Sequence, residues 1–333
     1  MASMRDVADR ARVSAKTVSR VFNDDPHVSP DTRARVRAAM ADLGFTPNLV
    51  ARTFRTGRDA ALGVAVPDVA DPFFAHVVRA IEDVASARGC VVVVTSLGHD
   101  PDRERPSVEA LLHRQLVGLI VVPTSPDQSY LAPWAAQAPV VFVDRAPTGH
   151  LGDTFVEDDE GGARAATAHL LAHGHRRIAF AGDALGTPTS RHRMLGHRAA
   201  LADAGVEPDD DLVRLGDWSA GPTGLLEPLL QAGATAIFSS DARSSVGVVL
   251  GLHALGRRDV ALVSFGDLAL GAALTPGLTA VDQDPHALGT AAATRVFARI
   301  DEPGRRRRRT TVLPVSLVAR GSGELPPAMS SVT

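Results

Sequence analysis

The sequence predicts an α/β protein in which a small all-α unit precedes two doubly wound α/β lobes. Three observations support this fold class: short amphipathic helices in the first 45 residues, a basic linker after them, and a long remainder in which apolar runs alternate with amphipathic helices. With 333 residues and 45% apolar content, the chain is long enough for two or three domains that each have a core.

The first unit is predicted to form three helices, over residues 4–11, 15–22 and 31–43. In the second of them, Val18, Val21 and Phe22 fall on one side at 3.6 residues per turn. Ser29 is placed to cap the third helix, and Pro30 suits its first turn. Two helices joined by a tight turn, with a third across them, form a helix-turn-helix, whose second helix offers its outer face to the major groove of DNA.

The outer face of that second helix carries two cations. Lys16 and Arg20 lie four residues apart and therefore stand one above the other. Residues 1–58 contain 11 Lys+Arg and 6 Asp, a net charge of +5, whereas the other 275 residues contain 24 Lys+Arg and 32 Asp+Glu, a net charge of −8. A basic unit before an acidic body favours nucleic acid as the partner of the basic unit, because counterion release drives binding to phosphates.

The remainder contains seven apolar runs: ALGVAVP, CVVVVTS, VGLIVVP, PVVFVD, RRIAFAG, TAIFSS and VALVSFG. Continuous runs bounded by Gly, Pro and Asp are typical of buried strands in parallel sheets, with the helices between them as crossovers. Seven runs are too many for one small sheet, so we expect two lobes with a ligand in the crevice at the carboxyl ends of their strands. The linker before them, residues 46–60, is too short to be stable as an isolated helix.

Several motifs, spread over nearly the whole chain, resemble those of the LacI/GalR family of bacterial transcription regulators: RDVADRARVSAKTVSRVFN, VPDVADPFF, HLLAHGHRRIAFAG and LTAVDQDPHALG. The resemblance implies a two-lobed, periplasmic-binding-protein-like (type I) body. It divides the chain into a DNA-binding domain at 1–45, a hinge at 46–60, an effector-binding and dimerisation domain at 61–320 and a C-terminal tail at 321–333. Lobe 1 is expected at about 61–157 and 285–318, and lobe 2 at about 158–284.

The resemblance also implies roles in DNA binding. The positions that match base-reading residues of the family are Ala15, Lys16 and Arg20, of which Arg and Lys can donate to guanine O6 and N7. The positions that match phosphate-contacting residues are Ser14, Thr17, Ser19, Asn23, His27, Ser29 and Thr32. For each of these, a solvated side chain or a local helix cap is the alternative.

The hinge is expected to become a helix when two subunits meet on the operator. The residues that match its minor-groove contacts are Asn48, Ala51, Arg52, Phe54 and Arg55. Phe54 stands where the family usually has Leu, and its ring is expected to wedge between base steps and kink the duplex.

One departure from the family lies in the turn between the first two helices, where Arg12 replaces the usual Gly. A positive φ is therefore expected at a residue that disfavours it.

The resemblance places six residues around an effector cleft: Phe74, Asp144, Arg193, Trp218, Ser240 and Gln283. An arginine fork, carboxylates and an aromatic face commonly hold polar ligands in such clefts. Two positions depart from the family, because Ser240 replaces a frequent Asn and Gly266 a frequent Asp. Either the effector, a sugar-like or other small polar metabolite, is not an ordinary sugar, or groups such as His197 and Asp267 compensate.

Two other functions compete with this interpretation. An enzyme lacks support, since the sequence has no G-x-S-x-G elbow, no phosphate-binding G-x-x-x-x-G-K-[ST] loop and no dinucleotide-binding glycine motif. The histidines at 169, 173 and 175 are better explained as helix-end caps than as metal ligands, and the arginine run 305–309 as a solvated loop. We therefore expect no catalytic residue, cofactor or metal.

A solute-binding protein of the same two-lobed fold is the second competitor. The charged N-terminus without an apolar leader segment and the attached helix-turn-helix argue against it. We expect a cytoplasmic, homodimeric repressor whose partners are operator DNA and a small effector, with no membrane association. The single cysteine, Cys90, excludes an intramolecular disulfide.

Overall fold

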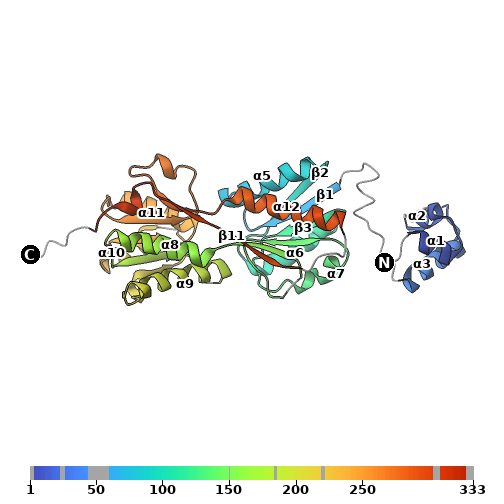
Figure 1. The fold of residues 1–333 in the computed structure, drawn as a ribbon, viewed down its shortest axis with the longest axis horizontal. Coiled ribbons are helices and arrows are strands. Elements are labelled where there is room, and N and C mark those ends of the chain that lie inside the picture. Colours follow the sequence, from blue (N-terminus) through green and yellow to red (C-terminus); the bar gives the residue numbers. More distant parts are fainter. Residues whose placement is uncertain are drawn as a thin grey trace, which may run out of the picture. The chain divides into compact units, whose positions relative to one another are not determined.

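The computed structural model describes residues 4–22, 27–43, 60–149, 151–183, 186–218, 222–302 and 308–327 (Figure 1). The chain divides into two compact units, residues 1–58 and 59–333. Among the helices of the described ranges, none has both the length and the apolar character that crossing a bilayer requires.

The N-terminal unit is a three-helix arrangement of α1 (Met4–Ala11), α2 (Ala15–Phe22) and α3 (Pro30–Asp42), as predicted. A small core holds the helices together, and its buried members are Val7, Ala8, Ala11, Val18, Val21, Val28, Val36 and Ala39. These apolar side chains recur at helical spacing, so each helix has one buried side and one side that faces away from this core.

The second unit contains two six-stranded sheets, one in each lobe. The first sheet has the order β11-β5-β4-β3-β1-β2, and all its strands are parallel. Its strands are β1 (Ala60–Val66), β2 (Cys90–Ser96), β3 (Leu116–Val121), β4 (Val140–Val143), β5 (Asp153–Glu157) and β11 (Thr310–Leu313). The helices of this lobe are α5 (Pro72–Ser86), α6 (Pro101–Leu112), α7 (Ala132–Ala135) and α12 (Pro285–Asp301).

The second sheet has the order β12-β10-β9-β8-β6-β7, in which only the β10–β12 pair is antiparallel. Its strands are β6 (Ile178–Gly182), β7 (Val213–Leu215), β8 (Ala236–Ser239), β9 (Ala261–Phe265), β10 (Thr279–Asp282) and β12 (Ser316–Val318). Its helices are α8 (Asp159–Ala172), α9 (Pro188–Asp203), α10 (Pro222–Gln231) and α11 (Ala242–Ala254). All seven predicted apolar runs form strands of these two sheets, which confirms the predicted fold class.

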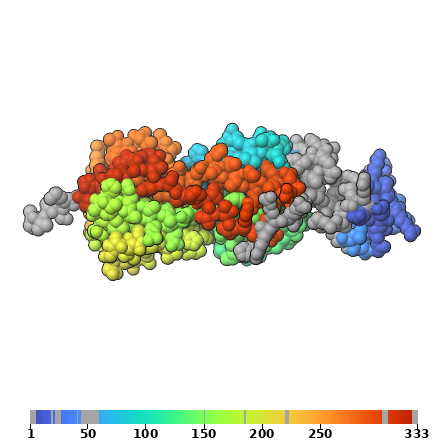
Figure 2. Space-filling view, viewed as in Figure 1, coloured from blue at the N-terminus to red at the C-terminus, as the bar shows by residue number. Residues whose placement is uncertain are grey.

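The boundary expected for lobe 1 at residue 318 is wrong. Strand β11 ends lobe 1 at Leu313, and β12 then pairs with β10 in the sheet of lobe 2. The chain therefore crosses between the lobes three times, after Glu157, after Asp284 and between β11 and β12. Residues after Asp284 form a band that runs from one lobe to the other on the face shown in Figure 2.

The expected tail at 321–333 is also wrong for its first residues. Ser322 is buried, and its Oγ donates to the carbonyl of Leu262 at 2.6 Å and accepts the Thr279 N–H at 2.9 Å. The Glu324 carboxylate accepts the Thr279 hydroxyl and pairs with His169. These contacts make residues 322–325 a part of lobe 2.

The histidine cluster takes part in the same packing. His175 is fully buried, with Nδ1 at 2.9 Å from the Thr235 hydroxyl and Nε2 at 2.7 Å from the Leu325 carbonyl. Only His173 caps its own helix, through the His169 carbonyl, so the helix-end explanation fails for His169 and His175. Among the described residues, no group of three or more His, Cys, Asp or Glu side chains could hold a metal ion.

Candidate DNA-reading face and effector cleft

The turn before α2 fixes how this helix starts. Arg12 has a φ of 53°, in the left-handed region expected for it, and its N–H donates to the Asp9 carbonyl at 3.2 Å. The next hydrogen bond, from Val13 N–H to the Ala8 carbonyl at 2.9 Å, closes the end of α1. The turn thus ends one helix within a few residues of the start of the next.

Two helices of this unit begin with the same pair of hydroxyls. The Ser14 Oγ accepts the Thr17 N–H at 3.1 Å and lies 2.9 Å from the Thr17 hydroxyl. The Ser29 Oγ accepts the Thr32 N–H at 3.4 Å and donates to the Thr32 hydroxyl at 2.9 Å. The two serines therefore act as local caps, each joined to its threonine hydroxyl, and all four side chains lie at helix N-termini, where the backbone N–H groups favour a phosphate.

The candidate base-reading residues lie on the surface. Ala15, Lys16 and Arg20 are exposed, whereas Val18 and Val21 of the same helix are buried. His27, a candidate phosphate contact, is exposed as well. The side chain of Ser19, the whole of Asn23 and the five hinge candidates Asn48, Ala51, Arg52, Phe54 and Arg55 lie outside the described residues.

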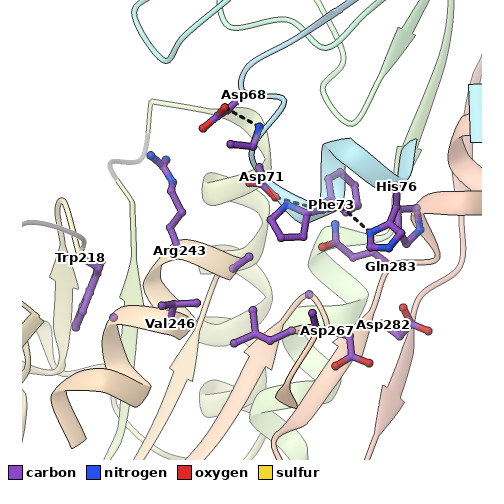
Figure 3. Close-up of a pocket in the computed structure, with 18 of the residues that line it drawn as sticks. Asp68, Asp71, Phe73, His76, Trp218, Arg243, Val246, Asp267, Asp282 and Gln283 are labelled. Carbon is purple, nitrogen blue, oxygen red and sulfur yellow. Dashed lines mark hydrogen bonds between the residues drawn. The ribbon is translucent and has the colours of Figure 1, made fainter. Parts of the chain in front are cut away.

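A cleft in the second unit is lined by both lobes and consists of two adjoining cavities. The first, of about 470 Å³, is lined by Asp144 and Arg145 from lobe 1 and by Asp183, Ser190 and Arg193 from lobe 2. We call it the polar cavity. The second, of about 670 Å³, is lined by apolar side chains of α11 and of the loop after β9, namely Val246, Leu250, Leu268, Ala269 and Ala272 (Figure 3). We call it the apolar cavity.

The structure brings four of the six predicted cleft residues into the polar cavity. Phe74, Asp144, Arg193 and Gln283 line it, and Gln283 also lines the apolar cavity. Asp144 follows β4 with a φ of 65° and forms an ion pair with the Nε of Arg145 at 3.2 Å.

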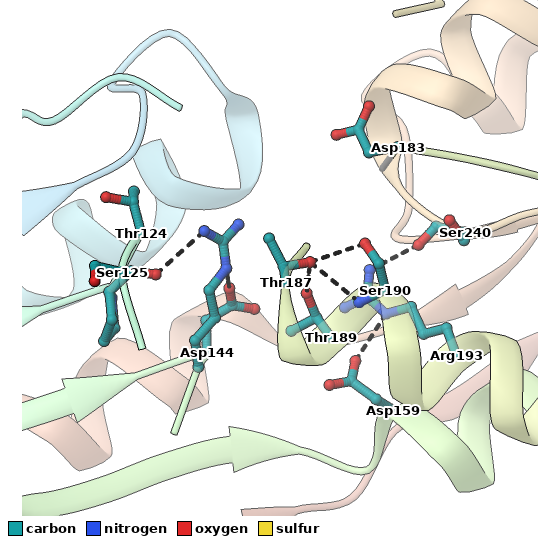
Figure 4. Close-up of polar contacts among 12 residues, drawn as sticks. Thr124, Ser125, Asp144, Asp159, Asp183, Thr187, Thr189, Ser190, Arg193 and Ser240 are labelled. Carbon is teal, nitrogen blue, oxygen red and sulfur yellow. Dashed lines mark hydrogen bonds and ion pairs between the residues drawn. The ribbon is translucent and has the colours of Figure 1, made fainter. Parts of the chain in front are cut away.

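Arg193 lies at the junction of the lobes and is almost completely buried (Figure 4). Its Nε donates to Asp159 at 2.7 Å, its Nη1 donates to the Ser240 carbonyl at 2.7 Å, and its guanidinium carbon lies 3.8 Å from the centre of the Phe265 ring. Burial strongly penalises an unpaired carboxylate, so Arg193 stabilises the folded protein by pairing with Asp159 and also lines the cleft. Replacing Arg193 with Ala would therefore leave the buried Asp159 carboxylate without its ion-pair partner.

Of the other two predicted cleft residues, one lines the apolar cavity of the cleft and one lines neither cavity. Trp218 lines the apolar cavity only, is 1% exposed, and donates its indole N–H to the Gly182 carbonyl at 3.1 Å. Ser240 is buried behind Arg193, and its hydroxyl donates to the Asp241 carboxylate at 3.2 Å. Its contribution to the cleft is the carbonyl that orients the arginine.

Of the two compensating groups considered from the sequence, His197 is excluded by its position. Its ring lies in the core of lobe 2 beside Phe180 and Phe238, at 3.0 Å from the Thr167 hydroxyl, and burial lowers its pKa to about 3. Asp267 does line the apolar cavity, where both of its oxygens accept from Arg320 at 2.6 Å.

Gly266 has a φ of +93°, which side chains rarely adopt, and a Cβ there would come within 3.2 Å of the Gln283 Oε1. A carboxylate at this position would therefore be strained.

Sequence reasoning missed several residues of the cleft. Asp183 follows β6 and Arg243 lies in the first turn of α11, and their ion pair lines the polar cavity; Asp159, which follows β5, lines neither cavity but pairs with Arg193. Each lies just beyond the carboxyl end of a strand. Marking the polar residues after every apolar run would have found them, because those ends meet at one edge of each sheet.

The comparisons with known proteins agree with this architecture. Residues 3–48 match the family model "Bacterial regulatory proteins, lacI family", and residues 167–323 match a periplasmic binding protein-like domain. The ribose operon repressor of Escherichia coli (strain K12) is 30% identical over 331 residues, which cover 97% of this chain and 100% of the repressor. The chain belongs to the LacI family.

Other relatives of this LacI-family chain extend the comparison. The transcriptional regulator GalR of Escherichia coli (strain K12) is 33% identical over 311 residues, covering 90% of each chain. The lac repressor dimer bound to operator and an anti-inducer matches 97% of this chain and 99% of its own, with 31% identity and a TM-score of 0.70. The regulator CelR in complex with cellobiose matches 97% of this chain with 28% identity and a TM-score of 0.69. The protein is thus a DNA-binding transcriptional regulator.

Proposed function

We propose that this protein represses transcription by binding a pseudo-palindromic operator as a homodimer, and that a small molecule in the interlobe cleft controls its affinity for DNA. The observation that carries the proposal is the joint presence of an exposed face on α2, with Lys16 and Arg20, and a cleft lined by both lobes. Two reading units need two half-sites, so dimerisation is part of recognition. Ala15, Lys16 and Arg20 read bases, and the hydroxyls at the starts of α2 and α3 hold phosphates.

The cleft supplies the control. A ligand that touches Asp144 on lobe 1 and Asp183 or Ser190 on lobe 2 stabilises the lobe arrangement in which both sides reach it. Such a ligand changes operator affinity only by its differential affinity for the two arrangements, and the coupling is reciprocal. We assign the protein no catalytic activity, since the relatives compared are transcriptional regulators, and we place its action in the cytoplasm.

The test is selection of genomic DNA fragments by the full-length protein. We expect enrichment of an inverted repeat with two half-sites, and loss of that enrichment in the Lys16→Ala/Arg20→Ala double variant. Enrichment of no sequence by the unaltered protein, together with saturable binding of a small molecule, would instead favour a solute-binding protein of the same fold.

The effector is found by screening sugars, polyols, nucleosides and small acids for an increase in melting temperature, followed by operator titration with each hit. Because Ser240 and Gly266 supply neither an amide nor a carboxylate, common hexoses and simple galactosides should bind weakly. Binding of an ordinary hexose at micromolar affinity would contradict that expectation.

A further inference from the structure

The charge balance of the cleft is uneven. The polar cavity is lined by five aspartates, Asp71, Asp144, Asp183, Asp217 and Asp241, and by three arginines. The apolar cavity adds Asp68, Asp267 and Asp282 and no further arginine or lysine. Eight carboxylates therefore line the cleft with three guanidinium groups. One of the eight, Asp267, pairs with Arg320 from outside both linings, so seven carboxylates share the three arginines.

The three arginines of the cleft are already paired. Arg145 faces Asp144 at 3.2 Å, Arg243 faces Asp183, and Arg193 faces Asp159 at 2.7 Å. The Arg193 partner does not line either cavity, so most of the Arg193 charge is matched outside the cleft, although it also acts on Asp144. His99 adds little positive charge, because burial and the nearby Arg243 lower its pKa.

Six of the eight carboxylates fall into two groups that face each other across the cleft. Lobe 1 contributes Asp68, Asp71 and Asp144. Asp71 caps α5, and burial and the negative charges of the other two raise its pKa. Lobe 2 contributes Asp183, Asp217 and Asp241, of which Asp241 caps α11. Burial and the negative charges of Asp241 and Asp217 act on Asp183 and raise its pKa. Like charges on opposing lobes repel, and a cation between them attracts both groups.

A buried carboxyl next to the polar cavity also indicates a shortage of positive charge. Glu157, the last residue of β5 before the chain crosses to lobe 2, is 3% exposed, and neither of its carboxylate oxygens has a hydrogen-bond partner. Burial, Asp144 and Asp159 raise its pKa well above the usual value. Burial likewise raises the pKa of Asp159 and of Asp183 to about 6 each. A site with too little positive charge of its own is complementary to a cationic ligand.

We propose that the effector carries a positively charged nitrogen, seated between the carboxylates of lobe 1 and those of lobe 2, with its uncharged part against the apolar cavity. The described residues offer no metal-binding group, so the cation is an organic amine or guanidine rather than a bare metal ion. This inference rests on the proposed function, since it names the class of ligand that the cleft takes. An amine that bridges both groups favours approach of the lobes, which is how it would alter operator affinity.

The experiment measures ligand binding to the full-length protein by thermal shift and by calorimetry, with matched pairs of probes. The amines are glucosamine, galactosamine, putrescine and agmatine; their uncharged counterparts are glucose and galactose, the N-acetyl hexosamines, and N,N′-diacetylputrescine with 1,4-butanediol. We expect at least one amine to bind, and its counterpart to bind about 10- to 100-fold more weakly because a charge-assisted hydrogen bond is lost. Equal or tighter binding of an uncharged counterpart, or binding by no amine of the set, would overturn the proposal.

Two variants separate charge from other causes. Asp183→Asn should reduce the preference for the amine over its counterpart, whereas Asp210→Asn, an exposed aspartate of lobe 2 away from both cavities, should leave that preference unchanged. A preference that survives in Asp183→Asn and in Asp144→Asn would also contradict the proposal.

Operator binding by the ligand-free protein is measured in parallel. If the ligand-free, unaltered protein binds no operator, the proposed function is contradicted. If a neutral sugar releases bound operator and no amine does, only the proposal of a cationic effector is contradicted.

Discussion

At the scale of single residues, Arg20 is the side chain of α2 best suited to read a base. It is exposed, lies four residues after Lys16, and can donate to guanine O6 and N7 through both arms of its guanidinium. We expect Arg20→Ala to cost about 1–3 kcal/mol on the true operator and to flatten preference at one base pair per half-site. Binding to single-base operator variants measures this. Arg35→Ala, which changes an exposed arginine of α3, serves as the control and should keep the base preference.

Glu157 offers a pH test at the same scale. Its folded-state pKa is raised, so the folded protein binds this proton more tightly than the unfolded chain does. The stabilisation is complete below the unfolded pKa and is lost as pH rises toward the folded pKa. Glu157→Gln cannot lose the proton, so its stability relative to the unaltered protein should rise with pH by up to about 1.4 kcal/mol per pH unit in that window.

Urea unfolding between pH 5 and pH 8 checks this prediction. Glu207→Gln, at an exposed position, is the matched control and should follow the unaltered protein throughout. Parallel stability curves for Glu157→Gln and the unaltered protein would show that Glu157 does not resist ionisation in the fold.

At the scale of the element, the hinge is the segment whose behaviour depends most on its partners. Its residues lie outside the described ranges, so the prediction rests on the sequence: a helix this short does not persist without DNA and a second subunit. Amide hydrogens of residues 48–56 should exchange quickly in the free protein and slowly on operator. Phe54→Ala should reduce both DNA bending and affinity. Equal protection in the two states would rule out coupled folding of this segment.

At the scale of the whole molecule, we expect one apolar surface of lobe 2 to join two subunits. Four of the eight exposed large apolar side chains of the described residues lie on α11 or in the loop after β9: Val246, Leu250, Leu270 and Leu274. Because α11 and this loop line the same cavity, these side chains belong to neighbouring parts of lobe 2. A patch of this kind is typical of a protein interface, so we place part of the homodimer contact there.

The dimer contact is tested by Leu270→Asp, which puts a charge into that patch at a side chain that is 75% exposed and lines neither cavity of the cleft. We expect the variant to sediment as a monomer at micromolar concentration and to bind operator at least about tenfold more weakly, because two half-sites are no longer linked. Leu195→Asp is the control, since Leu195 is 54% exposed but lies on α9. A dimer that persists in Leu270→Asp would place the contact elsewhere.

The sequence by itself determined what depends on nearby residues. Helical spacing of apolar side chains located α1, α2 and α3, continuous apolar runs located seven strands, and the resemblance to the family, which usually has Gly there, gave the positive φ at Arg12. The short strands β5, β7, β10, β11 and β12 were not predicted, because three to five residues with polar or charged members give no clear period.

Only the tertiary structure decided which distant residues meet. The pairing of β12 with β10 moved the end of the chain into lobe 2, and the core of lobe 2 enclosed His197, which the sequence had allowed in the cleft. The folded chain brings Asp159, Asp183 and Glu157 to the cleft region because each lies at or just after the carboxyl end of a strand. The partners of the two aspartates, Arg193 and Arg243, come from other parts of the sequence. A residue type sets what a side chain can donate, accept or ionise, but burial and the neighbouring charges, which belong to the folded chain, decide which of these it does.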